Sequence, residues 1–88
     1  DQEKAGALER ELAEHEVADY RARVALHPGD ASLRVQLAWR LMRADEIDGA
    51  LAELQKANSD PRLRREALFL MAQCFQRKGF TDLARKEY

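Results

Sequence analysis

Cysteine, proline, glycine and aromatic residues are all scarce in this chain of 88 residues. The single cysteine, Cys74, cannot form an internal disulfide, so no disulfide framework stabilises the fold. With two prolines and four glycines, the chain has few residues that interrupt a helix. No apolar run approaches the roughly 20 residues that cross a bilayer, so we expect no membrane insertion and a cytoplasmic location.

An excess of one charge sign is also lacking, since 15 basic residues are interleaved with 16 acidic residues. No basic face attracts nucleic acid, and we predict no nucleic-acid partner. The densest basic group consists of Arg62, Arg64 and Arg65. We interpret it as a solvated surface that pairs with neighbouring acids such as Asp60 and Glu66.

Sequence motifs of enzymes and metal sites are missing too. His15 and His27 are twelve residues apart, and neither has a second metal ligand at a spacing of three or four. There is no phosphate-binding glycine loop, and no nucleophile has a base within sequence reach. Cys74 lies in an almost wholly apolar run, which favours a small buried hydrophobe over a reactive thiol. We therefore expect no catalysis, no cofactor and no metal.

Helical periodicity, broken by a few turn signals, predicts an all-α protein. Pro28 and Gly29 interrupt the first helix, and Asp30 suits the N-cap of the second. Asp60 followed by Pro61 marks the start of a later helix, because the carboxylate accepts from free backbone donors and proline has none to leave unpaired. We expect helices over residues 2–26, 31–43, 47–58 and 61–78, followed by a fifth.

The last part of the chain is predicted to turn at Gly79. Thr81 suits the cap of a fifth helix, which begins at Asp82 and is still running at Tyr88. Leu83 and Tyr88 are expected on the inward face of that helix. We interpret the chain as a segment of a longer protein whose next helix covers this face.

A set of apolar residues recurs after 34 positions, so that Leu37, Ala38, Leu41, Ala50 and Leu54 return as Met71, Ala72, Phe75, Ala84 and Tyr88. This order of small and large residues resembles the tetratricopeptide repeat (TPR) family, whose unit is a helix-turn-helix of 34 residues. The resemblance implies one domain over residues 1–88, an α-solenoid of antiparallel helix pairs with about two repeats. A long capping helix over 1–27 precedes a repeat over 31–58 and a truncated repeat over 62–88.

The alanines in this pattern predict where the helices approach each other most closely. Ala38 and Ala50 make room for one another, and Ala72 and Ala84 repeat the arrangement. Glu16 occupies a place where the repeat has a small residue. The first helix is therefore interpreted as an extended cap and not as half of a complete repeat.

In TPR arrays the first helix of each pair lines a concave surface that binds partners. The outward stripes of the second and fourth helices hold Ser32, Val35, Gln36, Trp39, Met42 and Arg43, and Glu66, Phe69, Leu70, Gln73, Gln76 and Arg77. Trp39, Phe69 and Leu70 are large apolar residues next to amides and arginine, a composition typical of interface hot spots. An alternative stays open, in which the first helix folds over this end and buries Trp39 in the core.

One TPR subclass grips the terminal carboxylate of a chaperone peptide with lysine, asparagine and arginine. Here those places hold Val35, Gln36, Trp39, Glu66 and Leu70, so this specificity is not expected. We predict a non-catalytic module that binds a protein or an extended or helical peptide. Two alternatives remain: a structural module that forms homo-oligomers through exposed array ends or the N-terminal helix, and an accessory domain of an enzyme encoded elsewhere in the parent chain.

Overall fold

The structure is a computed structural model that describes the backbone of residues 2–87 and the side chains of residues 8–79. It contains α1 (Gln2–Leu26), α2 (Ala31–Arg43), α3 (Ile47–Ala57) and α4 (Arg64–Glu87), and no strand occurs in this part of the chain. The prediction of an all-α protein with one long N-terminal helix is confirmed.

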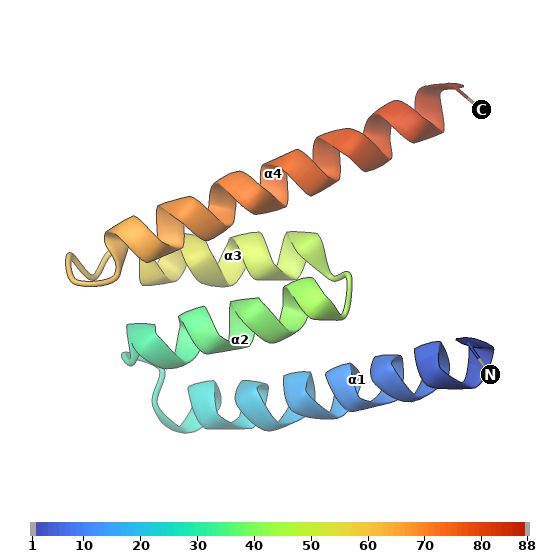
Figure 1. The fold of residues 1–88 in the computed structure, drawn as a ribbon. Coiled ribbons are helices and arrows are strands. Elements are labelled where there is room, and N and C mark those ends of the chain that lie inside the picture. The colour runs from blue at the N-terminus through green and yellow to red at the C-terminus, as the bar shows by residue number, and fades with distance from the viewer. Residues whose placement is uncertain (1, 88) are drawn as a thin grey trace.

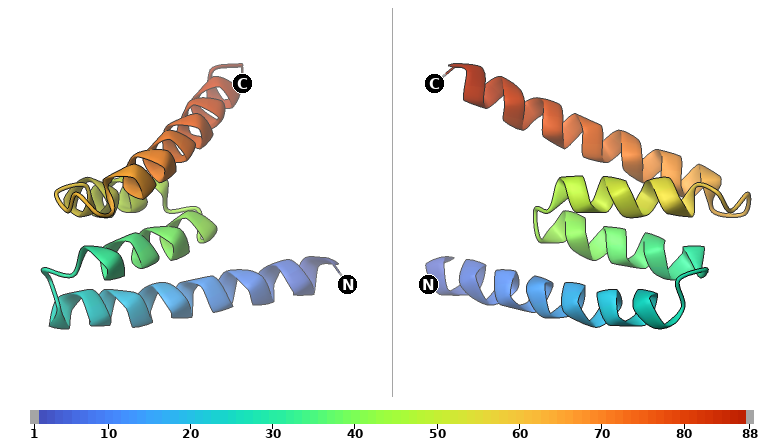
Figure 2. Two further views of the ribbon diagram at one scale, coloured as in Figure 1. Left: turned by 60° about the vertical axis from the view of Figure 1, so that its left-hand side comes forward. Right: turned by 180° about the vertical axis from the view of Figure 1, so that it is seen from behind.

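The four helices lie side by side in chain order, and each runs antiparallel to the one before it (Figure 1). The principal contacts are α1 with α2, α2 with α3, and α3 with α4. The Cα atoms extend over 39 × 28 × 16 Å, so the helices form a thin slab. As Figure 2 shows from two further directions, α4 diverges from α3 towards its C-terminal end. A single layer of this kind leaves α1 and α4 each with a side that no other helix covers.

The turn between α1 and α2 forms where proline and glycine predicted it. Asp30 is the N-cap of α2, and its Oδ1 accepts a hydrogen bond from the backbone N–H of Leu33 at 3.1 Å. The guanidinium of Arg34 donates to the carbonyl oxygen of Pro28 from Nε at 3.2 Å and from Nη2 at 2.9 Å. The Asp30 bond satisfies a backbone N–H that the helix start leaves without a partner, and the Arg34 bonds tie α2 to the turn that precedes it.

α2 and α3 form the best packed pair in the molecule. Ala38, Leu41, Ala50 and Leu54 have no exposed surface, and Leu37 is 1% exposed. The prediction that these residues form the core is confirmed. Besides this apolar contact, Arg34 Nη1 donates to Glu53 Oε2 at 2.7 Å between side chains that are 15% and 13% exposed.

The connection from α2 to α3 is a tight turn of three residues. Asp45 adopts a left-handed φ of 63°, which asparagine and aspartate tolerate better than other side chains do. The N–H of Glu46 then donates to the carbonyl oxygen of Leu41 at 2.8 Å. This turn reverses the chain and sets α3 against α2.

The start of α4 lies three residues later than the sequence predicts. Asp60 Oδ1 accepts from the N–H of Arg62 at 2.9 Å, and the N–H of Leu63 donates to the carbonyl oxygen of Asp60 at 3.1 Å. These bonds hold Pro61 to Leu63 in a turn, and the helix begins at Arg64. Asp60 therefore caps the turn that contains Pro61, and the helix begins after this turn.

The predicted break at Gly79 is wrong, because α4 continues through it to Glu87. Glycine in a helix interior costs only about 1 kcal/mol relative to alanine and keeps its N–H for the helical hydrogen bond. No proline follows that would stop the helix. A separate fifth helix starting at Asp82 is therefore not formed. The expected orientations of Leu83, Ala84 and Tyr88 lie outside the described side chains.

The buried face of α4 also differs from the one that the repeat predicts. Ala67, Leu70 and Cys74, at spacings of three and four, join the core and are at most 1% exposed. Ala72 and Phe75 are exposed, although the residues 34 positions before them are buried. The reason is that α4 has α3 on one side only, because no fifth helix folds back on the other.

Candidate partner-binding surface

The most prominent apolar side chain on the surface of α2 is Trp39, which is 45% exposed. Gln36 is half-buried one turn earlier, and Arg43 is exposed one turn later. Gln36 Nε2 donates to the hydroxyl of Ser32 at 3.5 Å, so the polar part of this stripe is ordered along the helix. Trp39 therefore lies among amide, hydroxyl and guanidinium groups on an open helix face. The alternative that α1 buries Trp39 as core is wrong.

Three of the predicted contact residues are in the core instead. Val35 is 3% exposed, Met42 is 4% exposed and Leu70 is 1% exposed, and all three belong to the main hydrophobic cluster. Val35 and Met42 lie seven residues apart on the same side of α2 as Ala38. An apolar helix face wider than one stripe is needed because α2 packs against elements on more than one side. These residues pack in the core beneath the exposed side chains and are not available to a partner.

The predicted stripe of α4 is partly open. Phe69 is 63% exposed, Glu66 and Gln76 are exposed, and Gln73 is half-buried. These residues follow one another at spacings of three and four, so they form a continuous line along the helix. Phe69 supplies a second exposed aromatic ring on a different helix from Trp39.

Arg77, just past the middle of α4, connects this helix to the end of α2. Its Nη1 donates to the carbonyl oxygen of Met42 at 3.1 Å, and its Nη2 lies 3.7 Å from Asp45 Oδ1. Nearby, Lys78 Nζ donates to Asp48 Oδ1 at 2.7 Å. Arg77 is thus placed at the predicted surface but has a structural role, because it satisfies one of the last carbonyl groups of α2.

The sequence analysis missed the ionic contacts between α1 and α2. Glu16 Oε2 lies 3.8 Å from Arg40 Nε and 3.6 Å from Arg43 Nη1. The guanidinium carbon of Arg40 also lies 4.2 Å from the centre of the Tyr20 ring, a cation–π contact. The signal was present in the sequence, since Glu16 is an acid where the repeat has a small residue. That anomaly is explained by its two arginine partners.

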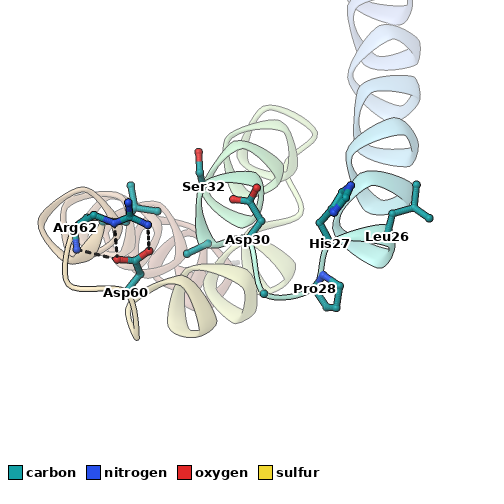
Figure 3. Close-up of a pocket in the computed structure, with 10 residues that line it drawn as sticks. Leu26, His27, Pro28, Asp30, Ser32, Asp60 and Arg62 are labelled. Atoms are coloured by element: carbon teal, nitrogen blue, oxygen red, sulfur yellow. Dashed lines mark hydrogen bonds and ion pairs between the residues drawn. The ribbon is translucent and has the colours of Figure 1, made fainter.

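A shallow depression of about 800 Å³ lies where the α1–α2 and α3–α4 turns meet. Its polar lining includes His27, Asp30, Asp60 and Arg62 (Figure 3). The carboxylate of Asp60 accepts hydrogen bonds from the backbone N–H and the guanidinium of Arg62. The carboxylate of Asp30 caps α2. Both acids are therefore engaged in holding turns, which is the structural use of such residues at helix starts.

Three groups in the described part of the chain have shifted pKa values with clear causes. The hydrogen bonds from Arg62 lower the pKa of Asp60, and Asp60 in turn raises the pKa of Arg62. Burial raises the pKa of the Cys74 thiol, and Arg77 opposes this shift only in part. The Asp60 carboxylate is thus fixed in its charged form near neutral pH, while Cys74 is fixed as a thiol. Both shifts move the pKa away from neutral pH.

Within the described part of the chain, no three potential metal ligands converge on one point. Over the same residues, no helix is both long enough and apolar enough to cross a bilayer. Comparison with protein-family models, curated proteins and solved structures gives no match to this chain. What can be argued about function therefore comes from the residues and their arrangement.

Proposed function

We propose that this chain is a non-catalytic, TPR-like protein-interaction module. The partner is a protein or a peptide, and it binds along the exposed stripes of α2 and α4. We assign the contacts to Gln36, Trp39, Arg43, Glu66, Phe69 and Gln73. The observation that carries the proposal is the exposure of Trp39, which is 45% accessible on a face where α1 and α3 already satisfy the packing of α2.

The exposed indole of Trp39 favours a partner that presents an apolar side chain to this surface. A large indole that remains exposed to water gains free energy when a partner covers it, and tryptophan is the residue most enriched among interface hot spots. The amides of Gln36, one turn before Trp39 on α2, and of Gln73 on α4 offer both donors and acceptors. Such groups suit the backbone of an extended peptide or the polar face of a short helix.

The charges around Trp39 do not select a partner of one sign. Arg43 lies 3.6 Å from Glu16, and Glu66 is an exposed acid on α4. Paired charges at the rim of a contact fix orientation more than they add affinity. We therefore expect binding to this surface to depend weakly on salt. A cytoplasmic location stays a prediction.

The proposal is tested by selecting ligands from a phage-displayed library of random peptides on the immobilised chain. Peptides that are selected are then titrated against Trp39→Ala and Phe69→Ala. Loss of an interface anchor costs about 2 kcal/mol or more, so we expect Trp39→Ala to weaken binding by roughly 30-fold.

Leu8→Ala is the matched control, since Leu8 is a comparably exposed residue, at 60%, on α1. It should bind the same peptides with unchanged affinity. Trp39→Ala should also unfold at nearly the denaturant concentration of the unmutated chain, whereas removal of a core tryptophan typically costs about 3 to 5 kcal/mol. Selected peptides that bind Trp39→Ala as tightly as the unmutated chain would contradict the proposal.

A further inference from the structure

The long helix α1 is attached to the rest of the molecule by few buried side chains. Over its described residues, only Ala13, Val17 and Val24 are buried, and each keeps 5% to 8% of its surface exposed. Tyr20 adds a partly buried ring that packs against the core. By contrast, α3 is less than half as long and buries four side chains, three of them completely. Apolar burial is the main force that holds a helix in place, so α1 is held more weakly for its length than α3 is.

The polar contacts from α1 to its neighbours are long. Glu16 Oε2 lies 3.8 Å from Arg40 Nε and 3.6 Å from Arg43 Nη1, and Arg21 Nη2 lies 3.8 Å from Glu46 Oε2. Within residues 8–79, Glu16 Oε2 and Arg40 Nε are buried atoms without a hydrogen-bond partner. The attraction of a charge pair offsets the loss of hydration only where the geometry is good. The ion pairs that join α2 to α3 and α3 to α4 are, instead, hydrogen bonds of 2.7 Å.

The remaining charged groups on this side of α1 add little to its attachment. Arg23 Nη2 lies 3.1 Å from Asp19 Oδ2, four residues earlier on the same helix. The guanidinium carbons of Arg23 and Arg40 lie 4.8 Å and 4.2 Å from the centre of the Tyr20 ring. Of these contacts, the one with Arg40 joins α1 to α2. Ionic and cation–π contacts between partly exposed side chains are weak, because water screens them.

The turn that follows α1 is held by α2. The guanidinium of Arg34 donates two hydrogen bonds to the carbonyl oxygen of Pro28, and Asp30 caps α2. These bonds do not depend on the position of α1, so the turn can keep its shape when α1 moves. The N–H of His27 makes the last helical bonds of α1. His27 is therefore the place where α1 can pivot.

From these observations we infer that α1 is a lid, which opens as a unit about His27 while α2, α3 and α4 stay packed. Parts of a protein with few buried apolar contacts open at a lower free energy than the whole molecule. Leu33 and Leu37 share a side of α2 with Arg40, the residue that contacts α1 through Tyr20. Opening of the lid exposes this apolar side to water. The inference goes beyond the proposed function, because it concerns the side of α2 that α1 covers and not the surface around Trp39.

The inference is tested by native-state hydrogen exchange of the full 88-residue chain, measured by NMR at urea concentrations below the unfolding transition. A helix of this length is only marginally stable by itself in water, so the amides of a detached α1 exchange. We expect residues 13–24 to be protected at least roughly ten-fold less than the middle of α2 and α3. We also expect these amides to share one urea dependence, because the lid opens as a unit. Equal protection of α1 and α3, or a separate urea dependence for each amide of α1, would overturn the inference.

Two core variants provide a matched test of independent opening. Val17→Ala removes two buried methyl groups from α1 and should speed the exchange of its amides about ten-fold. Leu51→Ala weakens the core at α3, which α2 separates from α1 (Figure 1). It should speed exchange in α3 and leave exchange in α1 unchanged, because α3 is packed in the same way whether the lid is open or closed. Leu51→Val takes its place if circular dichroism shows that Leu51→Ala is unfolded. Faster exchange of α1 and α3 by the same factor in the Leu51 variant would contradict a lid that opens alone.

Discussion

At the scale of single side chains, two alanine residues allow α2 and α3 to pack closely. Ala38 and Ala50 have no exposed surface, and Leu37, Leu41 and Leu54 fill the space around them. A small side chain at such a position lets two helix backbones approach, and close-packed interiors respond to the addition of even one methylene group. The identity of these residues, more than their hydrophobicity alone, therefore determines how the pair packs.

Ala50→Leu is expected to destabilise the protein by about 1 to 3 kcal/mol, the usual cost of overpacking a core. Ala52 is two residues away on the exposed side of α3, so Ala52→Leu should be tolerated. Urea unfolding of both variants, followed by circular dichroism, measures the difference. Equal free energies of unfolding would mean that Ala50 is not at a close helix contact.

Cys74 provides a chemical probe of the packed face of α4. It has no exposed surface, and burial raises the pKa of its thiol, so little thiolate forms at neutral pH. We expect Ellman's reagent to modify the native chain far more slowly than the urea-unfolded chain at the same pH. Equally fast modification in both states would place Cys74 on the surface and would contradict the packing of α4 on α3.

At the scale of elements, the helices were predictable where local signals agree with packing. Pro28, Gly29 and Asp30 interrupt the chain, and the structure forms a turn and a capped helix there. The predicted bounds of the fourth helix were wrong at both ends, because the sequence signals there are ambiguous. Asp60 caps a turn before it caps a helix, and Gly79 is compatible with a helix interior as well as with its end. Only the arrangement of the neighbouring helices decides between these outcomes.

Gly79→Ala tests the continuity of α4 directly. A Cβ atom at Gly79 would meet no other atom within 4 Å, and alanine is favoured over glycine in a helix by about 1 kcal/mol. The variant should therefore unfold at a higher denaturant concentration and keep the same circular dichroism spectrum. A clear loss of stability would instead mean that Gly79 adopts a backbone conformation that alanine avoids, as at a helix end.

At the scale of the whole molecule, the candidate binding surface could be predicted only in part. The 34-residue spacing places Trp39 and Phe69 on outward stripes, and both are exposed. The same spacing includes Val35, Met42 and Leu70, which are buried. Periodicity shows which residues share a helix face, but it does not show how wide the buried part of that face is. That width depends on how α1, α3 and α4 pack around α2.

The whole-molecule shape also explains why apolar side chains remain exposed. A single layer of helices leaves its end helices uncovered and keeps Trp39 exposed to water on α2.

The most direct test of the proposed binding surface uses Trp39, the only tryptophan in the chain, as its own reporter. Its fluorescence is measured with increasing acrylamide, first for the free chain and then with a saturating selected peptide. We predict strong quenching in the free chain, because the indole is partly exposed, and a clearly smaller quenching constant in the complex, because the peptide covers it. A saturating peptide that leaves the quenching of Trp39 unchanged would contradict the account.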